Sequence, residues 1–488
     1  MKRIRSCACE KKGRRMWQKV LFYGAVFLLL NIIVYPIAPM FDDWYYDTAP
    51  NPNFSLSQLL PGEAFWRPLD VLFGAFLGLC PKLFPVLNRA VVIFAHVANA
   101  YLLSAIAQKL EIKQSWRRFG VCFFLFSSAI WAVVTSPDAL NQAYSAFFGL
   151  LGLYLYAKRG GYSYIPLCMV ALLWKESGVS WFFVIPVYEV IVNCKTWDAF
   201  FKSKERILHA VKQVALGLLM VLVYFVVRFA LYGEIALGSS EGGTYKLSLL
   251  SFSAVKNLVL LLASASTGVD SMALLGVEKS LLLAGFTLLL SGVFLAACAY
   301  GLIRMVKGKN SFFGLLLLVI CVLGLALPLV LLGNAGEMHA YPVLCGMMLV
   351  FCFVLDRSGL TVKQLCIPVV CLFLAFGISS AHKLMSIYEY SDRTKELTES
   401  LYEQYEQCDE PTLYVVVNDW KGYSVFTQSS AMGTSYGLSL RPYYDWAVLE
   451  RVAYFAESEE DALAYIRANA EKYGQIIIIR DETAEKVK

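Results

Sequence analysis

The sequence is poor in charge, because only 16% of its 488 residues are Asp, Glu, Lys or Arg, whereas 58% are hydrophobic. A soluble chain of this length needs more charge to cover its surface. Histidine is scarce as well, and the four histidines show no zinc-like spacing. The thirteen cysteines lie mostly within apolar runs and predict no disulfide framework. Together these features exclude an ordinary soluble protein and predict a polytopic α-helical membrane protein.

The amino-terminal segment, residues 1–19, is strongly basic. It carries eight Lys and Arg residues against a single acid, Glu10. An apolar run from about Val20 to Ala38 follows and is long enough to cross a bilayer. A cleaved signal peptide is the alternative, but no A-x-A-like site of small residues follows the run. We therefore expect the basic segment to be cytoplasmic.

About eleven apolar stretches have spanning length, and we expect a transmembrane domain over residues 20–386. The stretch 162–193 is ambiguous, because Lys175 and Glu176 interrupt it; it is one long helix or two short ones. Two helices place every basic turn on the side of the basic amino terminus, which favours that alternative. The predicted spans are 20–38, 84–107, 119–135, 139–157, 162–174, 178–193, 208–231, 281–303, 312–333, 339–355 and 365–386.

This topology assigns a common, extracytoplasmic face to several segments far apart in the chain. They include the first loop, residues 41–83, the turn at 175–178, the loop at 232–280 and the segment at 334–339. In the 232–280 loop, residues 258–265 are apolar but too short to span, which favours a re-entrant or interfacial helix.

Residues 387–488 have a different character and are expected to form a small extracytoplasmic α/β domain. Thr412–Val417 alternates like a strand, Glu459–Lys472 has helical periodicity, and Gln475–Ile479 has the pattern of a short buried strand. This region has neither a glycine-rich phosphate loop nor a His/Cys cluster, so it predicts no chemistry of its own. The chain as a whole shows no internal repeat and no low-complexity tract.

The acidic pair Asp42-Asp43, flanked by aromatic residues, directly follows the first span. Two adjacent carboxylates at the membrane surface are unfavourable unless a cation, a hydroxyl-bearing substrate or a basic partner meets them. Other acids, bases and aromatics of the same face could provide that partner or bind substrate. They are Arg67, Arg89, His96, Lys175, Glu176, Glu337, His339 and Tyr341.

This combination suits a substrate with an anionic head group and a lipid tail. Arginine and lysine would hold a phosphate, and a carboxylate would take the proton of an attacking hydroxyl. Structural roles are the alternatives for single residues. The Asp pair suits a helix cap, and Arg67 could pair with Glu63 or extend to the interface. His96 suits an interhelical hydrogen bond, Lys175 and Glu176 could pair with each other, and His339 and Glu337 could be cap and anchor.

In order and spacing, these motifs resemble the GT-C superfamily of integral-membrane glycosyltransferases. The matching features are Asp42-Asp43, Arg67-Pro68-Leu69, Pro85 followed eleven residues later by His96, and Lys175-Glu176-Ser177-Gly178. Together with Met338-His339-Ala340-Tyr341-Pro342, they are similar to the branch of protein O-mannosyltransferases and tetratricopeptide-bearing transmembrane mannosyltransferases. The resemblance spans Met16 to Leu355. Where that branch has His-Pro, this chain has Ser136-Pro137; Asn141 stands near its Glu, and Arg89 and Val92 replace its His and Asn.

The resemblance implies inverting transfer of a sugar from a polyprenyl-phosphate carrier to an acceptor hydroxyl on the extracytoplasmic face. It implies that an Asp of the first loop is the general base or orients the acceptor. Arg67, Arg89 and Lys175 are then the expected phosphate ligands. The acceptor stays open between glycan, lipid and protein, and whether a divalent metal joins the carboxylates is open too. No other cofactor and no nucleic acid is expected.

Two other functions stay open: a transporter or flippase for a lipid-linked or charged solute, and a non-catalytic scaffold in surface-polymer assembly. Transporters tend to show matching halves with broken helices and ionisable groups near the midplane of the bilayer. The sequence has no matching halves, and its ionisable groups gather at one surface, which favours the enzyme. For a bacterial chain, the expected location is the plasma membrane.

Overall fold

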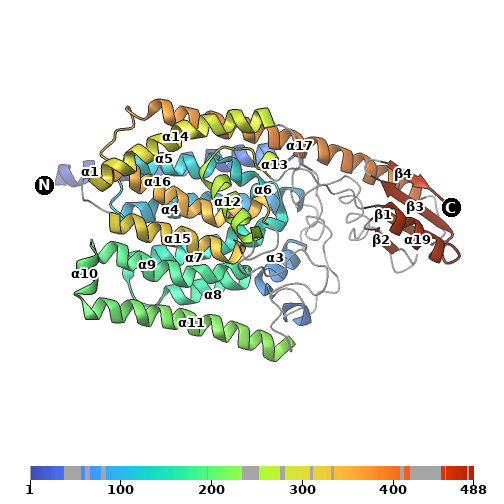
Figure 1. Ribbon diagram of the computed structural model, residues 1–488, viewed down its shortest axis with the longest axis horizontal. Helices are drawn as coiled ribbons and strands as arrows, with labels where there is room; N and C mark the ends of the chain where they lie inside the picture. The colour runs from blue at the N-terminus through green and yellow to red at the C-terminus, as the bar shows by residue number, and fades with distance from the viewer. Residues whose placement is uncertain are drawn as a thin grey trace.

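The computed structural model consists of a bundle of roughly parallel and antiparallel helices with a small sheet beyond one end (Figure 1). The long helix α17 (Cys366–Glu406) joins the two parts. The structure describes residues 2–37, 56–60, 66–78, 84–194, 196–232, 252–274, 281–307, 312–330, 335–406, 411–417, 452–456, 458–480 and 483–488.

Within these residues, seven helices are long and apolar enough to cross a membrane, which makes the chain an integral, multi-pass membrane protein. An eighth span is formed if α5 (Gln114–Phe126) is counted together with the bent continuation η2 (Ser128–Ile130) and α6 (Trp131–Val134). The seven are α1 (Lys2–Val34), α4 (Phe84–Lys109), α11 (Lys204–Tyr232), α14 (Leu281–Lys307), α15 (Phe312–Val330), α16 (Ala340–Arg357) and α17.

The expected number of about eleven spans is not confirmed, although helices form at all the expected places. The other three helices are α7 (Leu140–Arg159), α8 (Tyr164–Trp174) and α9 (Trp181–Asn193). With 11 and 13 residues, α8 and α9 are only about 16–20 Å long, well short of a hydrocarbon core of about 30 Å. Both ends of α7 are polar, with Asn141 and Gln142 at one end and Lys158 and Arg159 at the other.

The stretch 162–193 forms two helices, as the positions of the basic turns predict. The short η4 (Glu176–Ser180) separates α8 from α9 and reverses the chain. Gly178 packs directly on α8: a Cβ atom there would lie 2.4 Å from the backbone oxygen of Ala171. Only glycine allows this approach of two backbones, and the approach holds Lys175 and Glu176 at the end of the bundle.

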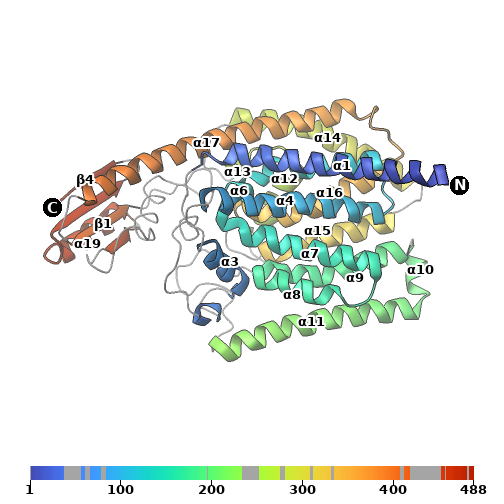
Figure 2. The same ribbon diagram turned by 180° about the vertical axis from the view of Figure 1, so that it is seen from behind.

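The two ends of the bundle differ in character. The amino terminus lies at one end, together with α10 (Trp197–Phe201) and the basic turns between α4 and α5 and between α7 and α8 (Figures 1 and 2). We call this end the basic end. The other end faces the sheet and is called the C-domain end. Several short elements gather there: α3 (Pro68–Gly78), η3 (Pro137–Ala139), η4, α13 (Ser271–Leu274) and η5 (Glu337–His339).

Helix α12 (Phe252–Ser266) forms over the stretch expected to be re-entrant or interfacial. It has 15 residues and packs against α15 and α16, with Asn257, Leu261 and Ala265 buried. It is an apolar helix too short to be counted as a span. Its placement relative to a membrane surface stays a prediction.

The carboxy-terminal sheet has the strand order β2-β1-β3-β4. The strands are β1 (Thr412–Val417), β2 (Val452–Ala456), β3 (Gln475–Arg480) and β4 (Thr483–Lys486); β1 pairs in parallel with β2 and β3, and β4 is antiparallel to β3. Helix α19 (Glu459–Asn469) packs its buried side on this sheet, in a core separate from that of the bundle. The predicted strand, helix and strand are confirmed, and β2 and β4 are additional.

Candidate functional site

The acidic pair Asp42-Asp43 lies outside the described residues, as does Glu63, so the site is built from the groups at the C-domain end. Arg67 is held there by its neighbour Trp66. The indole stacks on Tyr224 of α11 with 5.0 Å between ring centroids, and its Nε1 donates to the backbone oxygen of Leu59. The Tyr224 hydroxyl donates to the backbone oxygen of Trp66. Pro68 then starts α3, a position that suits proline.

The guanidinium of Arg67 forms an ion pair with Glu176 of η4, with 2.9 Å between Nε and Oε2. The expected alternative, a pair between Lys175 and Glu176, does not describe the contacts of these two residues. Instead, the Lys175 ammonium donates to Oδ1 of Asn141 at 3.0 Å. The consecutive residues Lys175 and Glu176 therefore contact different segments: Lys175 contacts α7, and Glu176 contacts the residue that precedes α3.

Asn141 is the centre of a short polar chain that the sequence did not predict. Its amide nitrogen donates to Oδ2 of Asp70 on α3 at 3.1 Å, while its amide oxygen accepts from Lys175. All three side chains are buried. The amide thus bridges the buried carboxylate of Asp70 and the buried ammonium of Lys175. We call the set of Arg67, Asp70, Asn141, Lys175 and Glu176 the Arg67–Lys175 cluster.

The ammonium of Lys175 is unusually easy to deprotonate. Burial, with a smaller contribution from the charge of Arg67, lowers the pKa of Lys175 to about 8. Three carboxylates act in the opposite direction: Asp138, Glu176 and Asp70. The side chain therefore remains a cation at neutral pH, in a place where water competes little for it.

Arg89 and Asn88 are buried in the first turns of α4, which begins at the C-domain end. Nε of Arg89 donates to the backbone oxygen of Thr135 at 2.8 Å. Thr135 ends α6, where the chain leaves the helical conformation and its carbonyl becomes available. This contact joins α4 to the connection between α6 and η3.

His96 and Tyr341 form a separate pair inside the bundle. Nδ1 of His96 lies 3.0 Å from the Tyr341 hydroxyl, and the amide of Asn99 donates to the same oxygen at 3.1 Å. The imidazole also stacks on Phe124. This is the interhelical hydrogen bond between α4 and α16 that was the structural alternative for His96.

The short η5 lies between two groups of charges. His339 accepts a hydrogen bond from the backbone N–H of Gly336 at 3.0 Å, the expected capping role, and it is within electrostatic range of Lys175 and Arg67. Glu337 is buried and lies on the other side, where the hydroxyl of Ser271 is 3.5 Å from its Oε1. Lys383 of α17 interacts electrostatically with Glu337.

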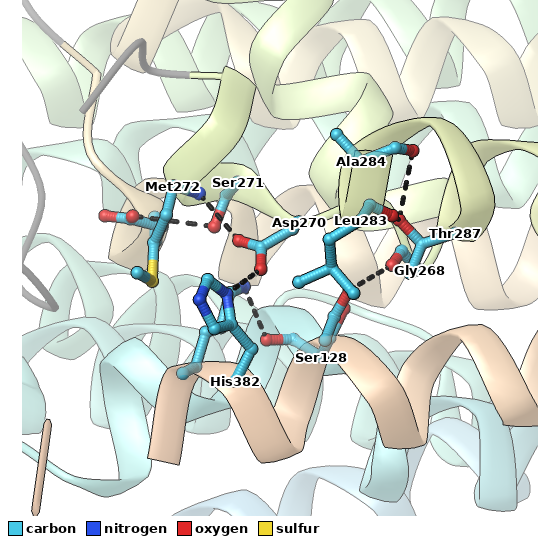
Figure 3. A network of polar contacts seen from close by, with 12 residues as sticks. Ser128, Gly268, Asp270, Ser271, Met272, Leu283, Ala284, Thr287 and His382 are labelled. Atoms are coloured by element: carbon cyan, nitrogen blue, oxygen red, sulfur yellow. Dashed lines mark hydrogen bonds and ion pairs between the residues drawn. The ribbon is translucent and has the colours of Figure 1, made fainter. Parts of the chain in front are cut away.

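A second polar cluster, which the sequence did not predict, connects α13 to α17 (Figure 3). Oδ2 of Asp270 lies 2.5 Å from Nδ1 of His382, and Oδ1 accepts from the backbone N–H of Met272. Lys383 donates to the backbone oxygen of Ser128 at 3.0 Å, where the break between α5 and α6 leaves a carbonyl available. We call Asp270, Ser271, Glu337, His382 and Lys383 the Asp270–Lys383 cluster. Of its members, Glu337 was a predicted site residue; for the others the only sequence signal was ionisable residues inside apolar stretches.

The two clusters offer complementary chemistry at one end of a membrane bundle. Arg67 and Lys175 supply cations for an anionic group, and the Asp270–Lys383 cluster supplies carboxylates, a hydroxyl and an imidazole. In the described part of the chain, no group of three or more His, Cys, Asp or Glu side chains is arranged to hold a metal ion.

Comparison with known proteins gives one structural likeness. No family model matches the chain, and no curated protein matches it. Among solved structures, it is similar to the archaeal oligosaccharyltransferase AglB from Archaeoglobus fulgidus, in complex with an inhibitory peptide and a dolichol-phosphate. The identity is 10%, the TM-score is 0.43, and the alignment covers 95% of this chain and 70% of that chain.

Proposed function

We propose that this protein is a GT-C-like glycosyltransferase that moves a sugar from a polyprenyl-phosphate donor to an acceptor hydroxyl on the extracytoplasmic side of the membrane. The observation that carries the proposal is the meeting of Arg67 and buried Lys175 at the C-domain end, opposite the basic turns. A cationic pair at the end of apolar helices suits a phosphate whose lipid tail lies in the bilayer.

In the proposed reaction, Arg67 and Lys175 bind the phosphate of the donor, and Arg89 supports the same region from α4. Asp42 and Asp43 act on the acceptor, either as general base or by orienting its hydroxyl. The bond between the anomeric carbon and the phosphate oxygen breaks as the acceptor oxygen attacks from the opposite side. The leaving polyprenyl phosphate gains negative charge, which the two cations stabilise.

The test is a transfer assay with the purified full-length protein in lipid nanodiscs. Radiolabelled polyprenyl-phosphate mannose and polyprenyl-phosphate glucose serve as donors, and the cell-envelope fraction of a deletion strain supplies acceptors. We expect label to leave the lipid fraction, and Asp42→Asn or Asp43→Asn to abolish this transfer while folded protein persists in membranes. Normal transfer by both single variants and the double variant would contradict the role of the pair.

The same donors distinguish the transferase from a flippase. A flippase reconstituted in vesicles moves the labelled lipid between leaflets and leaves the sugar attached to it. A transferase releases the sugar from the lipid. Label that changes leaflet but stays lipid-linked would favour the transporter.

A further inference from the structure

A fully buried carboxylate and a partly exposed imidazole face each other between α13 and α17 (Figure 3). The side chain of Asp270 is 0% exposed and that of His382 is 24% exposed. The Nδ1 edge of the ring faces the carboxylate at 2.5 Å, so Nε2 on the far edge of the ring points away from it. The nitrogen that can accept a proton therefore lies on the edge of the ring opposite Asp270.

The carboxylate is itself held in place. Its Oδ1 accepts from the backbone N–H of Met272 at 2.9 Å, which leaves Oδ2 for the imidazole. A carboxylate in this position keeps the proton on Nδ1 and stabilises the imidazolium that forms when Nε2 takes up a proton. This orientation turns a histidine into a proton acceptor.

The pair lies at the same end of the bundle as the Arg67–Lys175 cluster. Helix η5 connects the two, because His339 is within electrostatic range of Lys175 while Glu337 interacts with Ser271 and Lys383. A donor phosphate on the cations would therefore have the carboxylate-rich cluster as its neighbour. Carboxylates and hydroxyls of this kind suit the hydroxyl groups of a sugar or an acceptor.

The charges around His382 favour a proton acceptor. Lys383 of α17 interacts electrostatically with Asp270 and with Glu337 of η5. The formal charges of these three groups sum to one negative charge, which an imidazolium at His382 would balance.

We propose that His382 is a catalytic base of the transfer reaction and that Asp270 is its positioning residue. This inference rests on the proposed function. Nε2 of His382 takes the proton of the acceptor hydroxyl as the acceptor oxygen bonds to the anomeric carbon. The bond from that carbon to the phosphate oxygen breaks, its electron pair stays on the phosphate, and polyprenyl phosphate leaves. The imidazolium then returns its proton to water, and Asp42-Asp43 orients the acceptor.

The transfer assay described above tests this role with variants of the pair. His382→Gln and Asp270→Asn should each lower the rate about 10²- to 10⁴-fold. External imidazole should restore part of the rate to His382→Ala, which a purely structural role would not allow.

The chain contains a matched control. His209 and Glu189 form the same kind of pair at the basic end, with 2.9 Å between Nδ1 and Oε1. His209→Gln should retain wild-type transfer. If His382→Gln fails to fold, as judged by size-exclusion chromatography, Asp270→Asn and the rescue of His382→Ala by imidazole still test the proposal.

Three outcomes separate this inference from the proposed function. Full activity of His382→Gln would overturn the role of His382 and leave the transferase intact. A rate of His382→Ala that external imidazole does not raise would do the same. Absence of transfer by the wild-type protein would overturn the proposed function, and this inference with it.

Discussion

Arg67 and Glu176, which are 109 positions apart in the chain, form an ion pair with 2.9 Å between Nε and Oε2. Their side chains are 20% and 24% exposed, so the pair lies at the boundary between the bundle and its surroundings. Glu176 orients the guanidinium before any substrate arrives. A guanidinium is a natural partner for a phosphate.

Removal of the Arg67 guanidinium should weaken binding of a polyprenyl-phosphate donor. A hydrogen bond to a charged group contributes about 1.5–3 kcal/mol, so Arg67→Ala should lower donor affinity about 10- to 100-fold. Binding of radiolabelled polyprenyl-phosphate mannose to the protein in nanodiscs measures this. Arg118→Ala, at an exposed position of the basic end, is the control and should bind like the wild type. Equal donor affinities for the two variants would contradict the role of Arg67 in binding the donor phosphate.

Donor binding should also weaken at alkaline pH because of Lys175. An amine holds a phosphate only while it is protonated, and the pKa of Lys175 is lowered to about 8. Its charged fraction therefore falls as the pH rises through 8, and affinity should be about tenfold lower at pH 9 than at pH 7. Lys175→Arg stays charged over this range and should lose the pH dependence. The same alkaline loss in both proteins would contradict the assignment.

Gly178→Ala should destabilise the turn that carries Lys175 and Glu176. The new Cβ would lie 2.4 Å from the backbone oxygen of Ala171, so η4 has to move away from α8. Overpacking of this kind costs about 1–3 kcal/mol. We expect a lower thermal midpoint in detergent and a lower transfer rate. Gly285→Ala is the control, because nothing lies within 4 Å of its Cβ; a midpoint equal to that of this control would refute the close contact.

Ile478→Ala should unfold the carboxy-terminal domain without unfolding the bundle. Ile478 is fully buried in a core separate from that of the helices. An Ile→Ala change at such a site costs about 2–5 kcal/mol. Limited proteolysis should cut the sheet while the membrane domain stays intact. Glu459→Gln, which breaks only the exposed pair with Arg480, should cost less than about 1 kcal/mol and leave the sheet resistant.

Local patterns predicted most of the helices and the strands β1 and β3. The basic turns also predicted the division at Lys175, because the sidedness of charge carries information that hydrophobicity alone lacks. The number of spans was less predictable, since the apolar stretches of α8 and α9 were counted as spans although the helices they form are shorter than a hydrocarbon core. α17 also runs without a break through the boundary expected after residue 386, because Tyr388 to Glu406 is as compatible with a helix as the apolar stretch before it.

The sequence named residues of the two clusters only where they belong to recognisable motifs. Arg67, Lys175 and Glu176 do, and they lie close together in the structure. Asp70, Asp270 and His382 belong to no such motif. Asp270 and His382 are 112 positions apart in the chain, but Oδ2 of the first lies 2.5 Å from Nδ1 of the second. No local sequence pattern predicts such a contact.

The unbroken course of α17 determines how far the sheet stands from the bilayer. A helix of 41 residues is about 60 Å long, twice the thickness of a hydrocarbon core of about 30 Å. The membrane-spanning part of α17 is Cys366–Thr394, so the turns from there to Glu406 extend beyond it as a stalk, and β4 packs against the helix. Because each added residue turns a helix by about 100°, the height of the sheet and the direction it faces are coupled. An insertion of seven residues into the stalk would move the sheet about 10 Å further along the helix axis and leave its orientation about that axis almost unchanged.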